Sequence, residues 1–519
     1  MKSLNKDFKK RAFFLKKQFT KTIEIYTFVE ILKSILTMTP SQVYEKELSF
    51  QADRRRASVK FISIVNDLWY EKSIELVLFR NSLINKNVGE ILKLHEYAGA
   101  FVNKPISIFD STEIAEGIKN LHLPPSKLDI GKLTFEYLQN GNKDQDVMSF
   151  LSNKLKDSQS FNAITPKDVV LYGFGRIGRL VARELMAKTG KGNQLRLRAI
   201  VTRGKITQDV LEKRASLLRN DSIHADFNGT VQVDLENSSL IINDTTVKII
   251  SAQQPEDIDY TAYGIQDALV IDNTGAFRDK EALERHLSSK GVSKVLLTAP
   301  CKGIPNIVHG VNHKGYDPKK HSIYSAASCT TNAITPVLKA IEDSFGLEHG
   351  HLETIHAYTN DQNLVDNMHS KYRRGRAAAL NMVITETGAG KAVAKALPQL
   401  EGKLTSNAIR VPVPNGSLAI LNLNLKDKVT KEALNSKIKE YALNGELVEQ
   451  IKYSIDNELV SSDIVGVSAP AIFDSHASIV DENTNSVVLY IWYDNEFGYS
   501  HQVIRLAKYI SEVRRFTYY

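Results

Sequence analysis

A strand that runs into a glycine-rich turn and a helix constrains this fold more than any other part of the chain. Val169-Val170-Leu171-Tyr172 is an apolar run of strand-forming residues, followed by Gly173-Phe174-Gly175-Arg176-Ile177-Gly178 and a helical pattern over residues 179–185. Gly173 permits the tight turn, Gly175 lets a pyrophosphate approach the backbone, and Gly178 lets the helix pack on the strand. Since the amides at the helix start favour phosphate, the segment predicts a dinucleotide-binding fold. A glycine-rich turn without a ligand is the alternative.

The residues after the next predicted strand bear on the choice of cofactor. That strand, residues 195–201, ends in Thr202 and Arg203. An acidic residue here would bind the ribose 2′-hydroxyl of NAD and repel the 2′-phosphate of NADP. No acidic residue is present, and Arg203 is able to pair with that phosphate. We therefore expect NADP, or the use of both NAD and NADP.

The chain has two cysteines, Cys301 and Cys329, which exclude a disulfide framework and a cysteine-rich metal cluster, so no metal site is predicted. Such sparse use fits a reducing compartment. Cys329 follows an apolar strand and precedes a predicted helix, where a thiol has a lowered pKa. A cysteine beside a histidine is an activated nucleophile, and His356 lies on a predicted strand downstream. From spacing alone, a buried inert cysteine is equally compatible, and Cys301 is interpreted as structural.

Length and charge indicate a protein of several domains and narrow the kinds of partner it can have. A chain of 519 residues is too long for one ordinary domain, and 42% hydrophobic with 24% charged residues is typical of a globular protein. The formal net charge is +8, but nine Lys or Arg against three Asp or Glu in residues 1–37 supply six of these charges. The nearly neutral remainder favours no specific nucleic-acid partner. No run of about 18 apolar residues occurs, so no membrane span is predicted.

Residues 1–43 are predicted to be a basic leader, for which disorder is one option. Apolar residues recur at helical spacing within residues 21–36, which is compatible with a targeting or membrane-surface helix. A dispensable tail, or a true start at Met38, is the favoured interpretation.

Residues 44–165 are predicted to be a helical extension that ends in a linker. Apolar residues from Val59 to Trp69 follow a helical period, as do Ile74, Val77 and Leu78. A polar stretch after residue 140 surrounds one short predicted helix, Val147–Leu155. Arg54-Arg55-Arg56 is compatible with phosphate or nucleic-acid binding, but a solvated helix face is favoured. An interaction or oligomer-clamping role is inferred by elimination only.

Eight sequence blocks between residues 168 and 509 resemble phosphorylating glyceraldehyde-3-phosphate dehydrogenase, and the long leading segment resembles the extended bacterial form of that family. The blocks are GFGRIGR (173–179), NTG (273–275), SAASCTTN (325–332), HAYTNDQ (356–362), RRGRAAALN (373–381), TETGAGKAVAK (385–395), IRVPVPN (409–415) and WYDNEFGYS (492–500).

The resemblance implies an α/β fold: a doubly wound Rossmann NAD(P)-binding domain at residues 166–328, joined by a C-terminal helix at 498–519, and an α+β catalytic domain at residues 329–497. It also implies a cytoplasmic homotetramer, with an S-shaped loop around residues 357–381 that reaches a neighbouring subunit.

The resemblance further implies the chemistry and the site. Cys329 would attack the aldehyde carbon of glyceraldehyde 3-phosphate, and His356 would act as general acid–base. Inorganic phosphate would then release 1,3-bisphosphoglycerate from the thioester. The implied cofactor-binding residues are Gly173, Gly175, Arg176, Ile177, Gly178, Thr202, Arg203, Thr274, Gly275, Thr298 and Asn495. Thr359, Asp361 and Arg410 match the site for the substrate's phosphate. Ser328, Thr330, Arg374, Thr387 and Gly388 match the site for the attacking phosphate.

Three departures from the family pattern matter. NAD-specific members carry Asp where Thr202 stands and commonly Leu-Pro where Asn367-Met368 stand, so both differences favour tolerance of NADP. The second cysteine often found four residues after the nucleophile is replaced by Ala333.

The rival functions are an erythrose-4-phosphate dehydrogenase, which hydrolyses its thioester with water, and a non-catalytic binding protein on the same scaffold.

Overall fold

The computed structural model describes residues 39–139, 146–161 and 164–519. The predictions for the leader up to residue 38 lie outside the described residues. Residue contacts divide the described chain into two units, one ending at Phe161 and including Phe516–Tyr518, the other comprising residues up to Arg515 together with Tyr519. Among the described residues, no helix combines the length and the apolar character that crossing a bilayer requires.

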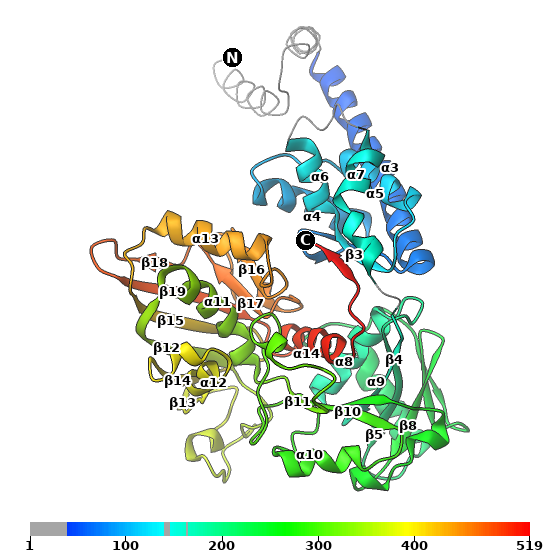
Figure 1. Ribbon diagram of the computed structural model, residues 1–519, viewed down its shortest axis with the longest axis vertical. Helices are drawn as coiled ribbons and strands as arrows, with labels where there is room; N and C mark the ends of the chain where they lie inside the picture. The colour runs from blue at the N-terminus through cyan, green and yellow to red at the C-terminus, as the bar shows by residue number, and fades with distance from the viewer. Residues whose placement is uncertain (1–38, 140–145, 162–163) are drawn as a thin grey trace. The chain divides into compact units, whose positions relative to one another are not determined.

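The first unit combines helices with a small sheet of strand order β2-β1-β3-β20 (Figure 1). Its elements are α3 (Pro40–Lys72), β1 (Glu75–Leu78), β2 (Asn81–Ser82), α4 (Val88–Phe101), α5 (Ile108–Asn120), β3 (Ser126–Asp129), α6 (Ile130–Gln139), α7 (Val147–Lys154) and β20 (Phe516–Tyr518). The mostly helical extension and the short helix that begins at Val147 are confirmed. The helical interpretation of Val77 and Leu78 is wrong: they lie in β1, a fully buried strand between β2 and β3.

The hairpin between β1 and β2 is held by a buried carboxylate. Phe79 and Arg80 form its turn with φ of 42° and 69°, a left-handed conformation that side chains other than glycine rarely adopt. Asp129, at the end of β3, accepts hydrogen bonds from both of their amides, at 2.9 and 3.0 Å. Its carboxylate also pairs with the Arg80 guanidinium at 3.1 Å. Because Asp129 is fully buried, these bonds stabilise the turn against its strain.

The first sheet of the second unit has the order β11-β10-β9-β4-β5-β8-β7-β6. Its strands are β4 (Lys167–Tyr172), β5 (Leu195–Thr202), β6 (Val231–Asp234), β7 (Ser239–Ile242), β8 (Thr245–Ser251), β9 (Ala268–Asp272), β10 (Val292–Leu297) and β11 (Ile323–Ser325). The six strands from β11 to β8 are parallel, and their order is that of a doubly wound Rossmann fold. The predicted nucleotide-binding fold is therefore confirmed.

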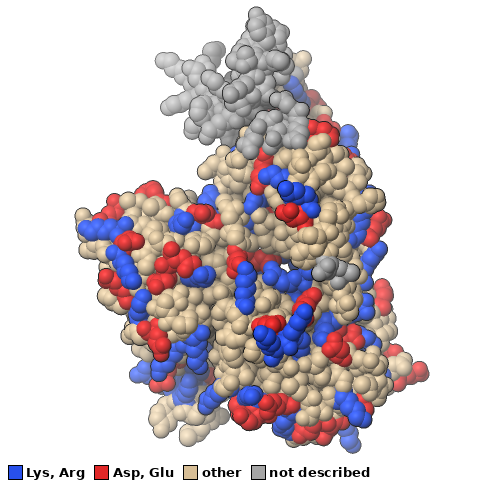
Figure 2. Space-filling view, viewed as in Figure 1, with Lys and Arg blue, Asp and Glu red and all other residues tan. Residues whose placement is uncertain are grey.

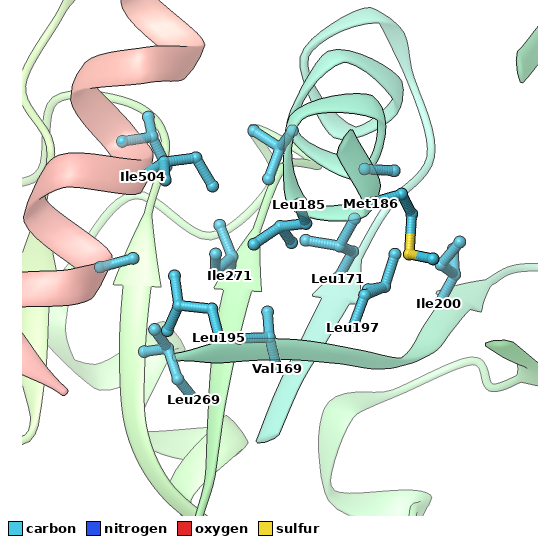
Figure 3. Packing of buried hydrophobic residues seen from close by; sticks show 14 of the residues in the cluster. Val169, Leu171, Leu185, Met186, Leu195, Leu197, Ile200, Leu269, Ile271 and Ile504 are labelled. Carbon is cyan, nitrogen blue, oxygen red and sulfur yellow. The ribbon is translucent and has the colours of Figure 1, made fainter. Parts of the chain in front are cut away.

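Helices cover both faces of this sheet because β4 alternates its side chains between two cores. Val169 and Leu171 pack with α8 (Arg176–Ala187), α9 (Gln208–Arg219) and α14 (Phe497–Ile510), as Figure 3 shows for Leu185 and Ile504. Val170 and Tyr172 belong to the opposite core, with Leu283 of α10 (Lys280–Leu287). Burial on both faces explains why β4 reads as a continuous apolar run.

The second sheet of this unit has the order β13-β14-β12-β15-β19-β17-β16, with β18 paired to β19. Its strands are β12 (Leu347–Ala357), β13 (Val383–Thr385), β14 (Leu404–Val411), β15 (Ser417–Leu425), β16 (Ile451–Ser454), β17 (Ala471–Asp474), β18 (Ile479–Val480) and β19 (Ser486–Tyr493). The associated helices are α11 (Cys329–Phe345), α12 (Ala389–Ala396) and α13 (Lys431–Leu443). Parallel and antiparallel pairs are mixed, as predicted for the α+β part. The predicted division between residues 328 and 329 stays a prediction.

The predicted C-terminal helix at 498–519 is too long. The helix α14 ends at Ile510, and Glu512 then takes the left-handed conformation with φ 55°. Residues 516–518 instead form β20, which pairs parallel to β3 of the first unit. The ring of Phe516 lies edge-on to that of Phe161 at 5.9 Å, and the Tyr518 hydroxyl donates to Glu136 at 2.6 Å. Pairing with a distant strand therefore overrides the local helical pattern.

Charged side chains of both signs lie interspersed on the face shown in Figure 2. This mixture is expected for a body whose formal charge is near neutral once the leader is set aside.

Candidate active site

The glycine-rich turn between β4 and α8 has the geometry that phosphate binding needs. Gly173 has φ 97°, and a Cβ at Gly178 would lie 2.4 Å from the Gly173 carbonyl oxygen, so both positions require glycine. Gly175 precedes α8 without a side-chain cap, and a Cβ there would meet no atom within 4 Å. The amides of Arg176 and Ile177 begin the helix. These uncapped amides fit a cofactor pyrophosphate.

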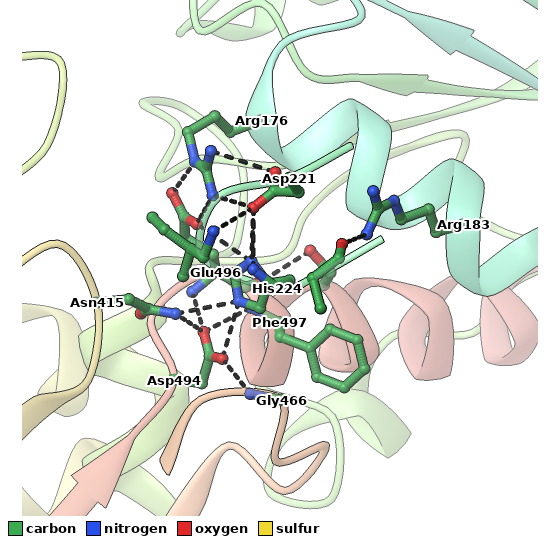
Figure 4. Close-up of polar contacts among 12 residues, drawn as sticks. Arg176, Arg183, Asp221, His224, Asn415, Gly466, Asp494, Glu496 and Phe497 are labelled. Carbon is green, nitrogen blue, oxygen red and sulfur yellow. Dashed lines mark hydrogen bonds and ion pairs between the residues drawn. The ribbon is translucent and has the colours of Figure 1, made fainter. Parts of the chain in front are cut away.

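The Arg176 side chain is directed to carboxylates rather than left free for phosphate (Figure 4). Its Nε and Nη2 donate to Glu496 at 2.6 and 2.5 Å, and Nη1 lies 3.3 Å from Asp221. Burial alone would raise the pKa of Asp221, but amide bonds from His224 and Ile223, together with Arg176, lower it to about 2. The Arg176 guanidinium therefore ties α8 to the segment after β19, and only its main-chain amide at the helix start fits a pyrophosphate.

Further polar contacts hold the segment that follows β19. Asp494 accepts from the Asn415 amide at 2.9 Å and the Gly466 amide at 2.8 Å, and lies 3.0 Å from His224 Nε2. The next residue, Asn495, accepts at its Oδ1 from the Ser417 hydroxyl at 2.9 Å. The residue predicted to contact the nicotinamide therefore lies in a firmly anchored segment.

The other predicted cofactor residues lie at the carboxyl ends of neighbouring strands. Thr202 ends β5 and Arg203 follows it, while Thr274 and Gly275 follow β9 and Thr298 follows β10. The buried Asp272 accepts from the Thr274 hydroxyl at 2.7 Å through its carboxylate and from the Thr298 hydroxyl at 3.0 Å through its carbonyl. Ligands of doubly wound sheets bind at this edge, where the strand order reverses between β4 and β9.

Cys329 is the first residue of α11, and Ser328 caps that helix by accepting from the Thr331 amide at 3.1 Å. His356 is the penultimate residue of β12, and its Nε2 lies 3.6 Å from the Cys329 sulfur. The structure therefore brings the predicted nucleophile and base together. A sulfur atom and an imidazole nitrogen at this distance can exchange a proton.

Burial dominates the titration of this pair. Burial raises the pKa of the Cys329 thiol, against the opposing effects of the Arg410 charge and hydrogen bonds from Thr330. The expectation of a lowered thiol pKa at a helix start is therefore wrong, because the loss of solvation exceeds the effect of the helix terminus. Burial and the Arg410 charge lower the pKa of His356 to about 3. At neutral pH the imidazole is therefore uncharged, with its Nε2 beside the thiol.

The guanidinium group of Arg410 contacts His356, and that of Arg374 lies in the loop that follows the strand of His356. Arg410 Nη1 lies 2.8 Å from His356 Nδ1 and donates to the Ala357 carbonyl at 2.7 Å. Arg374 donates to the Thr385 hydroxyl at 3.0 Å and pairs with Asp361. The charges of both arginines act on His356. Asp361 and Arg374, predicted for different anion sites, are thus in direct contact.

The remaining predicted phosphate residues lie near these groups or at neighbouring element ends. The Thr330 hydroxyl is 3.1 Å from the Tyr493 hydroxyl, and the Ser328 hydroxyl is 2.7 Å from that of Thr331. Gly388 precedes α12 without a side-chain cap, and the Thr387 hydroxyl accepts from the Ala389 amide at 3.3 Å. Thr359 lies in the loop after β12.

Sequence reasoning did not assign a role to several residues that the structure brings into the site. They are Asp221, His224, Asn415, Ser417, Tyr493, Asp494 and Glu496. Four of them fall in the blocks IRVPVPN and WYDNEFGYS that we quoted for the resemblance. The blocks marked these positions, but only the fold shows which partners they contact.

Buried histidines are expected to lower the stability of the second unit in acid. Burial lowers the pKa of His501 to about 4, despite the opposing charge of Glu184, and burial with the Arg514 charge lowers that of His313 to about 4. These values lie below the roughly 6.5 of an unfolded histidine, so the unfolded chain binds more protons. Above about pH 6.5 these histidines therefore do not reduce the free energy of unfolding. Below that pH, each of them lowers it by about 1.4 kcal/mol per pH unit, down to about pH 4.

Urea unfolding at pH 7, 6 and 5 measures this slope. His501→Gln should remove about one histidine's share of it. His476→Gln is the matched control, since His476 is exposed, and it should leave the slope unchanged. An equal slope for His501→Gln and the unmodified chain would contradict the assignment.

Comparison with known proteins adds to this geometry. Residues 167–280 match the sequence model of the glyceraldehyde 3-phosphate dehydrogenase NAD binding domain, and residues 328–495 match that of the C-terminal domain. A "glyceraldehyde-3-phosphate dehydrogenase-like protein" of Pseudomonas aeruginosa (strain UCBPP-PA14) is 48% identical over 455 residues, covering 86% of this chain and 97% of the relative. That alignment is longer than the second unit, so it includes residues of the first.

Shorter relatives cover a smaller part of the chain. A glyceraldehyde-3-phosphate dehydrogenase of Streptomyces coelicolor is 39% identical over 343 residues, 66% of this chain and 98% of the relative. Glyceraldehyde-3-phosphate dehydrogenase 1 of Bacillus cereus is 39% identical over 342 residues, 65% of this chain and 97% of the relative. With the Rossmann sheet and the paired cysteine and histidine, these matches show that the chain is an NAD-dependent oxidoreductase that belongs to the glyceraldehyde-3-phosphate dehydrogenase family.

Proposed function

We propose that the chain is a phosphorylating glyceraldehyde-3-phosphate dehydrogenase, which oxidises glyceraldehyde 3-phosphate with inorganic phosphate to 1,3-bisphosphoglycerate through a cysteine thioester. The observation that carries this proposal is the Cys329 sulfur 3.6 Å from a neutral His356, with Arg410 in contact with the imidazole and the charge of Arg374 acting on it. A nucleophile, a base and two cations for anionic groups suit acyl transfer to phosphate.

The first step follows from the neutral imidazole. As the Cys329 sulfur attacks the aldehyde carbon, its proton passes to His356 Nε2 and the carbonyl oxygen gains negative charge. The protonated imidazole and the Cys329 amide at the start of α11 then stabilise that oxygen, and His356 returns the proton to it. Burial favours the uncharged form of both groups at rest.

The second half of the reaction uses the same groups. A bound nicotinamide would supply the acceptor for the hydride that leaves the carbon attached to sulfur. His356 takes the hydroxyl proton as the hydride departs, leaving a thioester. A phosphate oxygen then attacks the thioester carbon, and the Cys329 sulfur leaves with the proton held by His356. Arg374 and Arg410 would neutralise the charge of the two phosphate groups.

We extend the proposal to cofactor use and to assembly. The absence of an acidic residue after β5, where Thr202 and Arg203 stand, supports use of NADP as well as NAD. A homotetramer is supported by exposed apolar side chains between residues 364 and 384, including Leu364 (80% exposed), Met368 (90%) and Tyr372 (88%). We also propose that the enzyme acts in glycolysis or gluconeogenesis and in the cytoplasm, in keeping with its sparse, unpaired cysteines.

A steady-state assay with NAD and with NADP, each with and without inorganic phosphate, tests the proposal. We expect continuous turnover of glyceraldehyde 3-phosphate only with phosphate. Without phosphate, a single burst of reduced cofactor equal to the enzyme concentration should accumulate, because the thioester has no acceptor. Sustained turnover without phosphate, above all with erythrose 4-phosphate, would indicate a hydrolytic dehydrogenase. No burst with either cofactor would favour a non-catalytic scaffold, and a strict preference for NAD would defeat the dual-cofactor proposal.

A further inference from the structure

Ser417 lies between the strand that carries the proposed base and the strand that leads to the residue predicted to contact the nicotinamide. It is the first residue of β15, fully buried, and it follows Asn415 and Gly416, the latter with φ 85°. It pairs with Tyr493 of β19, while the next residue of β15 pairs with β12. Ser417 therefore lies between the strand that carries His356 and the strand that leads to Asn495.

One hydroxyl group serves both neighbours. The Ala357 amide donates to Ser417 Oγ at 3.1 Å, and Ser417 Oγ donates to Asn495 Oδ1 at 2.9 Å. The Ala357 amide can only donate and Asn495 Oδ1 can only accept, whereas the Tyr493 hydroxyl, which also contacts the Ser417 side chain, can donate its own proton. The single Ser417 hydroxyl proton is therefore available for Asn495. This arrangement assigns the oxygen of the Asn495 amide to Ser417 and leaves its NH₂ group for another acceptor.

On the other side, Ser417 holds the peptide that orients the base. The Ala357 carbonyl accepts from Arg410 at 2.7 Å and lies 2.7 Å from His356 Nδ1. The bond from the Ala357 amide to Ser417 therefore restrains the same residue whose carbonyl contacts the imidazole and Arg410.

We propose that Ser417 is a positioning residue, which fixes the Asn495 amide so that its NH₂ group meets the nicotinamide carboxamide oxygen while it restrains the peptide behind His356. The inference rests on the proposed function for the role of Asn495 and His356. Without the hydroxyl, the Asn495 amide is free to turn over and present its oxygen. The carboxamide then loses its hydrogen-bond donor, and the nicotinamide ring loses its preferred orientation.

Calorimetric binding of NAD and of ADP-ribose to the full chain tests the proposal without turnover. Ser417→Ala should weaken NAD binding by about 3- to 10-fold, the effect of losing one hydrogen bond. Binding of ADP-ribose, which has no nicotinamide, should change by less than about twofold. Ser478→Ala is the matched control, because it removes another buried serine hydroxyl, 2.8 Å from the Asp474 carbonyl in the same unit, and should change neither affinity. Equal weakening of both ligands, or none, would overturn the proposal.

A double-mutant cycle separates positioning through Asn495 from general disturbance. If Ser417 acts through Asn495, then Ser417→Ala should no longer weaken NAD binding in an Asn495→Ala background. A full additional loss in that background would overturn the proposal. Ser417→Cys, which keeps a weak donor, should lie between the serine and alanine proteins and provides the comparison if Ser417→Ala folds poorly. Because no aldehyde or phosphate is used, these results are readable even if the acyl-phosphate chemistry proves wrong.

Discussion

Replacing Cys329 with Ser is expected to lower kcat by at least about 10³-fold, because the nucleophile and its base act as a unit. The neutral His356 can accept a proton from a thiol whose pKa burial has raised. An alcohol is a far weaker acid, so almost no alkoxide forms at neutral pH. The measurement is steady-state turnover with saturating substrates, accompanied by NAD binding, which should be nearly unchanged.

Cys301→Ser is the matched control for this experiment. Cys301 is buried in the core on the face of the Rossmann sheet that α10 covers, together with Val170 and Tyr172. Its sulfur contacts the Lys302 carbonyl at 3.3 Å. A hydroxyl can make the same bond, so kcat should change by less than about threefold. Near-normal turnover of Cys329→Ser would mean that another group forms the covalent bond.

Replacing His356 with Gln is expected to lower kcat/KM by about 10²- to 10⁴-fold near neutral pH, the usual contribution of a general base. Without the imidazole, the thiol proton must pass to solvent, and burial raises the pKa of that thiol. Activity of the variant should therefore rise about tenfold per pH unit toward the thiol pKa. The pH profile of kcat/KM between pH 6 and 9 measures this.

His351→Gln provides the comparison on the same strand. His351 lies five residues before His356 on β12, and its ring nitrogens contact Thr405 and Asn407 at 2.8 and 3.1 Å. Its replacement should leave both the magnitude and the pH profile of kcat/KM as they are. A flat profile for His356→Gln, parallel to the unmodified enzyme, would show that another group takes the thiol proton.

Local patterns predicted the fold where the structure depends on neighbours in sequence. The run Val169–Tyr172, the glycines after it and α8 form one continuous unit, so their physical requirements are all visible in the chain. The pattern at Val77 and Leu78 wrongly predicts a helix, because a short buried strand and a buried helix have the same apolar content. Likewise, residues 516–518 pair with β3, a partner that helical periodicity cannot reveal.

The site divides in the same way. Local patterns placed Cys329 before a helix and His356 on a strand, and the family resemblance, rather than spacing, implied that they act together. The direction of the thiol pKa shift was not predictable, because that shift depends on how many groups from other elements exclude water around the sulfur. The partner of the Arg176 guanidinium was also hidden, since Glu496 and Asp221 lie far from it in sequence.

The position of β20 has a consequence for folding during translation. The strand that pairs with β3 is translated only after almost the whole of the second unit. While the ribosome is at work, the nascent first unit has the hydrogen-bonding edge of β3 without its neighbour, and such an edge can pair with other chains. Completion of the first unit's sheet should therefore wait until residues 516–518 have been translated.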